Sequence, residues 1–143
     1  MKQKTEIRFQ SISENEGFAR VCAGAMAARL DPTIEEIEDL KTAVSEAVTN
    51  AIVHGYGGRE EGIITMEIGI EQNTVEIVIA DQGRGIADVE KAREPFFTTL
   101  GGEERSGMGF TIMETFMDSL AVESEPGQGT RVTMTKTIER GKK

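Results

Sequence analysis

Two alternating stretches separated by a short turn constrain this chain more than any other feature. Gln72-Asn73 between them is a typical turn sequence. We therefore predict an antiparallel hairpin over about residues 62–80 with one buried face, which a second layer of structure must cover. The alternating apolar positions are Ile64, Met66, Ile68 and Ile70 in the first stretch, and Val75, Ile77 and Ile79 in the second.

A long amphipathic helix, predicted to begin at Thr33 and to run to about His54, supplies such a cover. Thr33 followed by Glu36 is the signature of a capping box, and Gly55 is typical of a helix end. The apolar positions recur at helical spacing along one stripe. They are Ile34, Ile37, Leu40, Val44, Ala47, Val48 and Ala51.

The other segments continue this mixture of strands and helices. Further strands are predicted over about residues 5–11, 120–124 and 130–138, and helices over 88–93 and 109–117. We expect one domain over residues 1–143. Its fold class should be an α/β two-layer sandwich, with a mixed, mostly antiparallel sheet and helices packed on one face.

Another helix is predicted after Ser13, where Ser13 and Glu16 form a second capping-box signature. We assign its larger apolar residues to the core. They are Phe18, Val21, Cys22, Ala25 and Met26. The other side carries small residues, which either fill exposed sites or allow another chain to pack closely. They are Ala19, Ala23, Gly24, Ala27 and Ala28.

Charge and composition exclude several classes of function. The net charge of −9 argues against sequence-independent nucleic-acid binding, which needs a basic face. The single cysteine, Cys22, excludes an intrachain disulfide. No apolar run is long enough to span a bilayer, and residues 1–4 lack the apolar segment of a signal peptide. We expect a cytoplasmic protein with no direct contact to membrane or nucleic acid.

Glu46 and Asn50 lie one turn apart on the predicted long helix. Two oxygen ligands at this spacing suit Mg²⁺, or a metal ligand together with a proton acceptor. Taken alone, such a pair is more often a solvated polar stripe. His54 lies on the same stripe and is the only histidine, which excludes a histidine metal cluster and favours a structural role at the helix end.

Asp81 follows the second alternating stretch and shares the inward parity of Ile79. A carboxylate on the core face needs a hydrogen-bond donor, which an amino group such as that of adenine would supply. Gly83 and Gly85 permit tight turns and close backbone approach. Thr130 begins the last strand with inward parity and should lie near Asp81 if the strands are neighbours. The alternatives are an ordinary turn and a strand-edge threonine.

A glycine-rich segment over residues 101–109 precedes the helix predicted from Gly109. Glycines before a helix N-terminus expose backbone N–H groups to a site of positive potential, and phosphate is the natural ligand there. Arg105 lies in this segment and could reach a terminal phosphate. A flexible surface loop is the alternative. The Walker signature is absent, so this is not a P-loop enzyme.

Together, these segments resemble the N, G1 and G2 boxes of the Bergerat-fold ATPase and kinase superfamily. The matching residues, in order, are Glu46-x-x-x-Asn50, Asp81-x-Gly83-x-Gly85, Gly107-x-Gly109 and Thr130. Chain length and the presence of Glu46 favour the small serine/threonine kinases that act as anti-sigma factors. Residues 46–56, 95–99 and 106–110 are very similar to the sporulation anti-sigma-F kinases of Gram-positive spore formers.

The resemblance implies a Bergerat-type ATP-binding fold and a kinase that uses Mg²⁺ and ATP, with ADP as the product. It implies that Asp81 binds the adenine amine with help from Thr130, and that Asn50 ligates Mg²⁺. It implies that Glu46 accepts the proton of the attacking serine and that Arg105 steadies the transferred phosphoryl group. Further nucleotide contacts are implied for Gly83, Gly85, Thr98, Thr99, Gly107, Met108 and Gly109.

The resemblance also implies protein partners. They are a sigma factor that is held inactive, an anti-anti-sigma protein that is phosphorylated on a serine, and a second copy of the chain in a homodimer. The first strand and helix are the candidate interface, with Arg20 at a partner contact. A nucleotide-dependent binding module and a stand-alone ATPase remain as alternatives. Glu46 favours the kinase, because a pure binding module needs no base at that position.

Overall fold

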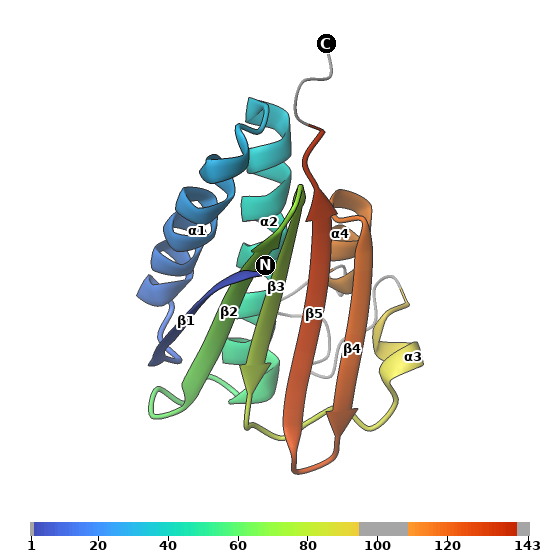
Figure 1. The fold of residues 1–143 in the computed structure, drawn as a ribbon. Helices are drawn as coiled ribbons and strands as arrows, with labels where there is room; N and C mark the ends of the chain where they lie inside the picture. The colour runs from blue at the N-terminus through green and yellow to red at the C-terminus, as the bar shows by residue number, and fades with distance from the viewer. Residues whose placement is uncertain (1, 95–108, 140–143) are drawn as a thin grey trace.

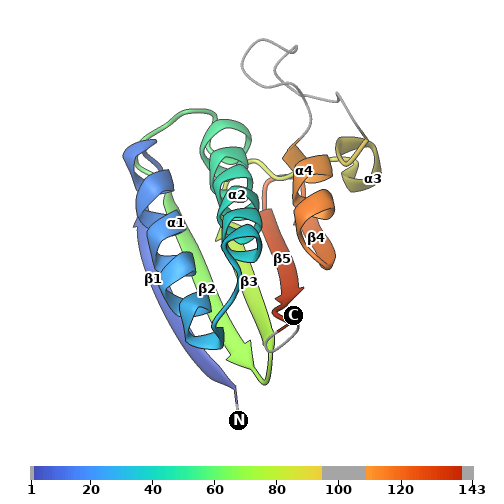
Figure 2. The same cartoon turned by 90° about the horizontal axis from the view of Figure 1, so that it is seen from above.

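The computed structural model of the protein describes residues 2–94 and 109–139, and these form a five-stranded sheet with helices on one face (Figures 1 and 2). The strand order is β1-β2-β3-β5-β4, and every neighbouring pair is antiparallel. The expected α/β sandwich is therefore confirmed. The elements are β1 (Gln3–Gln10), α1 (Glu14–Ala27), the 3₁₀ turn η1 (Ala28–Leu30), α2 (Ile34–Asn50), the π-helical turn η2 (Ala51–Gly55), β2 (Ile63–Glu71), β3 (Thr74–Asp81), α3 (Val89–Ala92), α4 (Gly109–Phe116), β4 (Ser119–Glu125) and β5 (Gly129–Thr137).

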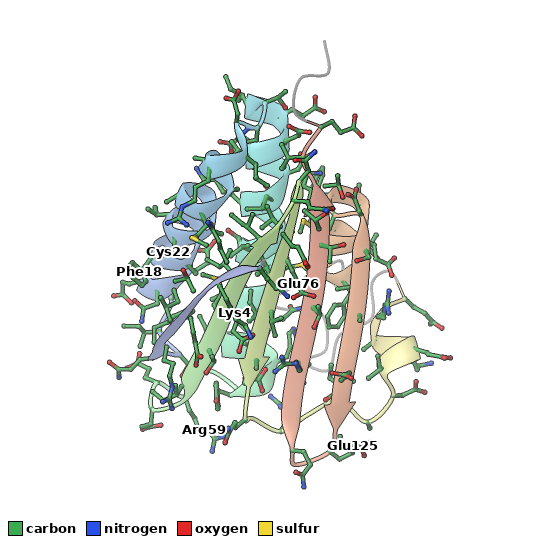
Figure 3. The ribbon with its side chains drawn as sticks, in the orientation of Figure 1. Lys4, Phe18, Cys22, Arg59, Glu76 and Glu125 are labelled. Carbon is green, nitrogen blue, oxygen red and sulfur yellow. The ribbon has the colours of Figure 1, made fainter. Side chains whose placement is uncertain are left out.

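The predicted hairpin is formed by β2 and β3. Met66 pairs with Ile79 and Ile68 with Ile77, and all four side chains are buried under the helices. Gln72 takes up the left-handed backbone conformation, with φ 56°, which closes the turn. The opposite face of the sheet carries charged side chains, among them Lys4 and Glu76 (Figure 3). Local alternation was therefore sufficient to predict both the pairing and the buried side.

The two predicted capping boxes have different outcomes. At the start of α2, the Thr33 hydroxyl accepts from the backbone N–H of Glu36 at 3.1 Å, and the Glu36 carboxylate accepts from the N–H of Thr33 at 2.9 Å. At the start of α1, Ser13 makes no side-chain capping bond, so the second prediction is wrong. Ser13 has a helical backbone, with φ −64° and ψ −27°, whereas a capping residue needs an extended one.

The assignment of the buried face of α1 is confirmed only in part: Met26 is buried and Cys22 packs against the core, but the other residues assigned to that face are exposed. The small residues Ala19, Ala23 and Ala27 are fully buried, whereas Phe18 is 51% exposed and Val21 is 66% exposed. Small side chains allow α1 to pack closely against α2 and β2, and this close packing decides which face is buried. The small-residue face therefore packs within the chain and is not a docking surface for another one. Figure 3 shows Phe18 on the outer side of α1.

Helix α2 ends in a wider turn than the sequence predicted. After Asn50, the turn η2 closes with a hydrogen bond from the backbone N–H of Tyr56 to the C=O of Ala51 at 2.9 Å, five residues back. The helix stops at Gly55 as expected. The turn contacts both β3 and β5, so the end of the α2 segment lies at the ends of these two neighbouring strands. At the other end of α2, Ile34 is 81% exposed, contrary to its assignment to the core stripe.

Across residues 2–94 and 109–139, no helix has both the length and the apolar character that crossing a membrane requires.

Candidate functional site

Asp81 is the last residue of β3 and points into the layer between the sheet and the helices. Its side chain is 8% exposed, and it pairs across the sheet with Thr130, as predicted. The backbone N–H of Gly83 donates to its Oδ1 at 2.9 Å. Burial raises the pKa of this carboxyl group, while the backbone N–H groups of Gly83 and Thr130 act in the opposite direction. The site therefore contains a buried acceptor that is held by backbone donors.

Gly55, at the end of η2, lies directly against this carboxylate. A β-carbon at residue 55 would be 2.8 Å from Cγ of Asp81, and one at residue 83 would be 2.0 Å from the C=O oxygen of Gly55. The backbone N–H of Arg84 donates to the same oxygen at 2.9 Å. The helix end and the turn after β3 are thus in backbone contact. Sequence reasoning treated Gly55 only as a helix stop and missed this contact.

Two further glycines shape the turn after β3. Gly129 has φ +88°, and a β-carbon there would be 2.1 Å from the backbone oxygen of Asp81. Gly85 has φ +77°, and a β-carbon there would be 2.0 Å from the backbone oxygen of Glu125. Gly85 was predicted as a nucleotide contact, and its close approach to the β4–β5 turn is a structural reason for glycine at that position. Gly129 was not predicted.

The hydroxyl of Thr130 belongs to a small polar network at the ends of β4 and β5. It lies 2.9 Å from the hydroxyl of Ser124, which accepts from the backbone N–H of Ile86 at 2.7 Å and donates to the backbone oxygen of Gly129 at 2.8 Å. The network anchors the segment that follows Gly85 to the strand next to Asp81. Ser124 was not predicted from the sequence.

Asn50 and Gly109 lie side by side, although 59 positions separate them in the chain. A β-carbon at Gly109 would be 3.0 Å from Nδ2 and 3.1 Å from Oδ1 of Asn50. The last residue of α2 therefore faces the first residue of α4, which brings together two of the predicted segments. Glu46 is half-buried one turn earlier on α2.

The donor set suits a metal that is shared with phosphate rather than one enclosed by protein. Among the residues that the structure describes, no three Asp, Glu, His or Cys side chains gather into a metal-binding group. Mg²⁺ usually keeps several waters and binds substrate phosphates together with one or two protein oxygens. The carboxamide oxygen of Asn50, beside the start of α4, fits that requirement.

Several predicted site residues lie outside the described part of the chain: Thr98, Thr99, Arg105, Gly107 and Met108. Arg20 is on the exposed side of α1, with its Nη1 3.9 Å from Oε2 of Glu16. The backbone oxygen of His54 accepts from Nε of Arg84 at 2.7 Å, and the structural role of the His54 imidazole stays a prediction.

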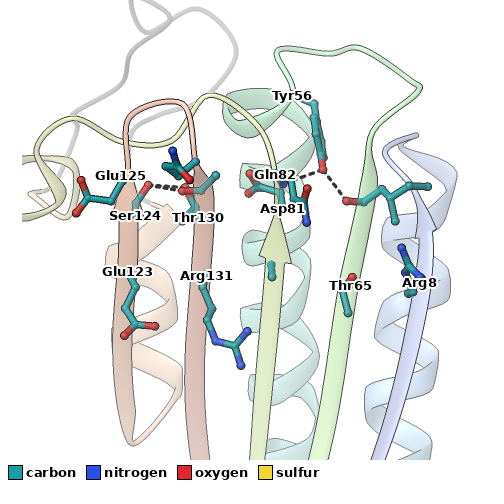
Figure 4. A pocket seen from close by; sticks show the side chains of 14 residues that line it. Arg8, Tyr56, Thr65, Asp81, Gln82, Glu123, Ser124, Glu125, Thr130 and Arg131 are labelled. Atoms are coloured by element: carbon teal, nitrogen blue, oxygen red, sulfur yellow. Dashed lines mark hydrogen bonds between the residues drawn. The ribbon is translucent and has the colours of Figure 1, made fainter.

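A hollow at the ends of the strands is lined by Asp81, Ser124 and Thr130 of this site and also by side chains on the outer face of the sheet (Figure 4). The β-ladder pairings place five of its residues in one row across all five strands, on the side away from the helices. The row consists of Arg8, Thr65, Ala80, Arg131 and Glu123. Because side chains alternate along a strand, this row and the carboxylate of Asp81 lie on opposite sides of the sheet.

Comparison with known proteins gives concordant matches. Residues 12–136 match the model of the histidine kinase-like ATPase domain family. An anti-sigma F factor from Thermoanaerobacter sp. (strain X514) is 60% identical over 133 residues, which cover 93% of this chain and 92% of the relative. An anti-sigma F factor from Halalkalibacterium halodurans is 51% identical over 142 residues, covering 99% of this chain and 97% of the relative.

Solved structures with low sequence identity share the fold. A crystal structure of the RsbU and RsbW domains of a Mycobacterium tuberculosis protein has a TM-score of 0.66 at 20% identity, and the match covers 95% of this chain and 32% of that longer one. A mycobacterial sensor histidine kinase has a TM-score of 0.59 at 18% identity, with 94% of this chain and 98% of that chain covered.

Proposed function

Because this chain belongs to the histidine kinase-like ATPase domain family and, within it, to the anti-sigma F factors, we propose that it is an ATP-dependent serine/threonine protein kinase and anti-sigma factor. In this proposal it binds and inhibits a sporulation sigma factor in the cytoplasm. It also transfers the γ-phosphoryl group of ATP to a serine of an anti-anti-sigma protein, which releases ADP.

The buried carboxylate of Asp81 is the observation that carries the nucleotide part of this proposal. A carboxylate offers about four lone-pair positions, and the backbone donors of Gly83 and Thr130 use only part of that capacity. The remaining capacity suits the exocyclic amine of adenine. A guanine base presents a carbonyl oxygen at the same position, which the carboxylate repels. Asp81 would therefore select ATP over GTP.

The contact between Asn50 and Gly109 supports a phosphate site at the other end of the nucleotide. The N-terminus of a helix favours anions, because its first N–H groups are unpaired and its dipole is positive there. The oxygen of Asn50 would hold Mg²⁺, which when bound neutralises charge on the phosphates. Glu46, one turn away, would accept the proton of the serine hydroxyl as that oxygen attacks. Arg105 would contact the transferred phosphoryl group.

The remaining nucleotide contacts are proposed for the two glycine segments and for the residues between them. They are Gly83, Gly85, Thr98, Thr99, Gly107, Met108 and Gly109.

The exposed side of α1 supports the proposed protein contacts. Phe18 and Val21 are exposed apolar residues on one helix, with Arg20 between them in sequence. Apolar residues that gather on a surface mark sites of protein association. We assign Phe18 and Val21, with β1 beside them, to a homodimer interface, and Arg20 to a contact with a sigma factor or anti-anti-sigma protein.

One assay separates the kinase from the two other functions. The chain is incubated with γ-labelled ATP, Mg²⁺ and a candidate anti-anti-sigma protein. Label on a serine of that protein supports the kinase, release of free labelled phosphate supports an ATPase, and nucleotide-dependent complex formation without either supports a binding module. Glu46→Gln serves as the control variant, because it should bind ATP and the partner but transfer no label.

A further inference from the structure

Tyr56 joins the end of the α2 segment to the turn that carries Asp81. Its hydroxyl accepts from the backbone N–H of Gln82 at 2.8 Å and donates to the backbone oxygen of Ile63 at 2.6 Å. Figure 4 shows both bonds meeting at the hydroxyl, between the ends of β2 and β3. A phenol has one proton, so a single hydroxyl fills the donor role and the acceptor role at once. The side chain is 7% exposed.

Gly62 provides the space for the ring of Tyr56. A β-carbon at residue 62 would be 2.6 Å from Cδ1, Cδ2 and Cε2 of that ring. The backbone of Gly62 is outside the left-handed region, so alanine can adopt its conformation. An alanine at this position would therefore act on the ring rather than on the local backbone.

The peptide bond that Tyr56 holds is the one directly after Asp81. The N–H of Gln82 and the C=O of Asp81 belong to the same rigid plane, so a bond to one end fixes the orientation of the other. The same plane lies against Gly129, as the close approach of Gly129 to the Asp81 oxygen demonstrates. This plane begins at the carbonyl carbon of Asp81 and leads to Gly83, so holding it restrains both the backbone that carries the Asp81 side chain and the N–H that donates to its Oδ1.

We propose that Tyr56 is a positioning residue for base selection: its hydroxyl fixes the peptide bond after Asp81, so that the carboxylate meets the amine of adenine. This proposal rests on the proposed nucleotide site. The backbone of Tyr56 is tied through Ala51 to the turn that follows Asn50. Tyr56 therefore links the base end of the site to its phosphate end.

The test compares the affinities of the full chain for ATP and GTP, measured by calorimetry with Mg²⁺ present. Tyr56→Phe removes only the hydroxyl. Loss of one hydrogen bond from a positioned group should weaken ATP binding by about tenfold. GTP, which gains nothing from a well-placed carboxylate, should change much less. The expected result is a smaller ratio of ATP affinity to GTP affinity, which is called the ATP/GTP preference below. Equal weakening of both nucleotides would overturn the proposal, because general loosening of the structure has that effect.

Two further variants keep the test decisive. Gly62→Ala should narrow the preference by displacing the ring, which reproduces the effect without altering Tyr56. Ser11→Ala is the matched control: the Ser11 hydroxyl donates to the backbone oxygen of Arg59 at 2.6 Å, in the same connection to β2, but makes no bond to Gln82. Its ATP/GTP preference should equal that of the parent chain.

Asp81→Asn tests the nucleotide site itself, independently of the positioning role of Tyr56. If Asp81→Asn narrows the preference and both Tyr56→Phe and Gly62→Ala leave it unchanged, the positioning role of Tyr56 is wrong and the nucleotide site stands. If Asp81→Asn itself leaves ATP affinity and preference unchanged, the proposed nucleotide site fails, and the role of Tyr56 fails with it.

Discussion

The carboxylate of Asp81 and the α-carbon of Gly55 are in such close contact that no side chain fits between them. A β-carbon on Gly55 would be 2.8 Å from Cγ of Asp81 and 2.9 Å from each of its two oxygens. The backbone at the end of the η2 turn therefore packs directly on the side chain at the end of β3, and the position of one determines the position of the other.

Gly55→Ala should displace the Asp81 carboxylate. We expect ATP affinity to fall by at least about tenfold, together with a loss of about 1–3 kcal/mol in the free energy of unfolding, as overpacking typically causes. Calorimetric titration and urea denaturation measure the two effects. Gly17→Ala on α1 is the matched control, because nothing lies within 4 Å of a β-carbon there. Parent-like ATP affinity in Gly55→Ala would contradict the contact's role.

The ionisation of Asp81 should make ATP binding depend on pH. Burial raises the pKa of this carboxyl above its ordinary value of 3.8, so the folded, ligand-free chain retains the proton to a higher pH than an exposed aspartate does. Adenine recognition needs the ionised acceptor, so ATP affinity should fall as the pH decreases through the raised pKa. The same shift means that ionisation of Asp81 lowers folding stability as the pH rises from 3.8 through the raised pKa.

Asp81→Asn is the variant that tests this pH dependence. ATP binding should be weaker in the variant at neutral pH. The part of the decrease in ATP affinity at low pH that protonation of Asp81 causes should be missing from the variant. Titrations of both proteins at several pH values above the onset of acid unfolding measure the difference. An identical acid dependence in the two proteins would remove Asp81 as its source.

Glu46→Gln should abolish phosphoryl transfer while nucleotide affinity stays close to that of the parent chain. General-base catalysis typically contributes about 10²–10⁴-fold to the rate, and a fall of this size is expected. Single-turnover transfer of labelled phosphate measures the rate. Glu38→Gln on the same helix is the control, since Glu38 is exposed and forms an ion pair with Lys41. Undiminished phosphoryl transfer by Glu46→Gln would show that a residue other than Glu46 is the general base.

The starts of helices α1 and α2 should respond differently to loss of a hydroxyl. Thr33→Ala removes the side chain of a complete capping box and should lower the free energy of unfolding by about 1 kcal/mol. Ser13→Ala removes a hydroxyl that makes no capping bond, and its effect should be close to zero. Urea denaturation of both variants measures the contrast, and equal effects would contradict the difference between the two helix starts.

The opposite faces of α1 should separate association from stability. Val21→Glu, on the exposed face, should weaken the proposed homodimer in sedimentation experiments and leave the monomer folded. Ala23→Leu, on the buried face, should instead destabilise the chain by about 1–3 kcal/mol through overpacking. If Val21→Glu associates as the parent chain does, the exposed face of α1 is not the homodimer interface.

The hairpin and the start of α2 could be predicted from the sequence because both depend on neighbours in the chain. Alternation in residues 62–80 specifies one buried side, and Thr33 needs only Glu36 three residues later. The buried face of α1 could not be predicted in this way, because hydrophobicity ranks Phe18 above Ala19. Whether a helix buries large or small side chains depends on how closely another layer approaches it, which is a tertiary property.

The residues of the candidate site likewise include some that the local sequence predicted and others that it could not predict. The parity of Asp81 and Thr130 predicted that they face inward, and the sheet pairs them. Gly55 and Gly129 were missed because their role exists only when distant backbones approach, and a glycine beside a turn has many ordinary explanations. The hydrogen bonds of Tyr56 likewise join β2 and β3, and nothing in its local sequence indicates them.

The π-helical turn at Ala51–Gly55 makes the length of this segment as important as its composition. Each residue added to or removed from a helix rotates everything beyond it by about 100°. A one-residue deletion between Asn50 and Gly55 would keep the helix and nearly all of its side chains, yet it would turn Gly55 away from Asp81 and the Tyr56 hydroxyl away from Gln82. Substitutions at the residues of this turn other than Gly55 can be absorbed by local repacking, whereas a change in its residue count would misalign Gly55 with Asp81 and Tyr56 with Gln82.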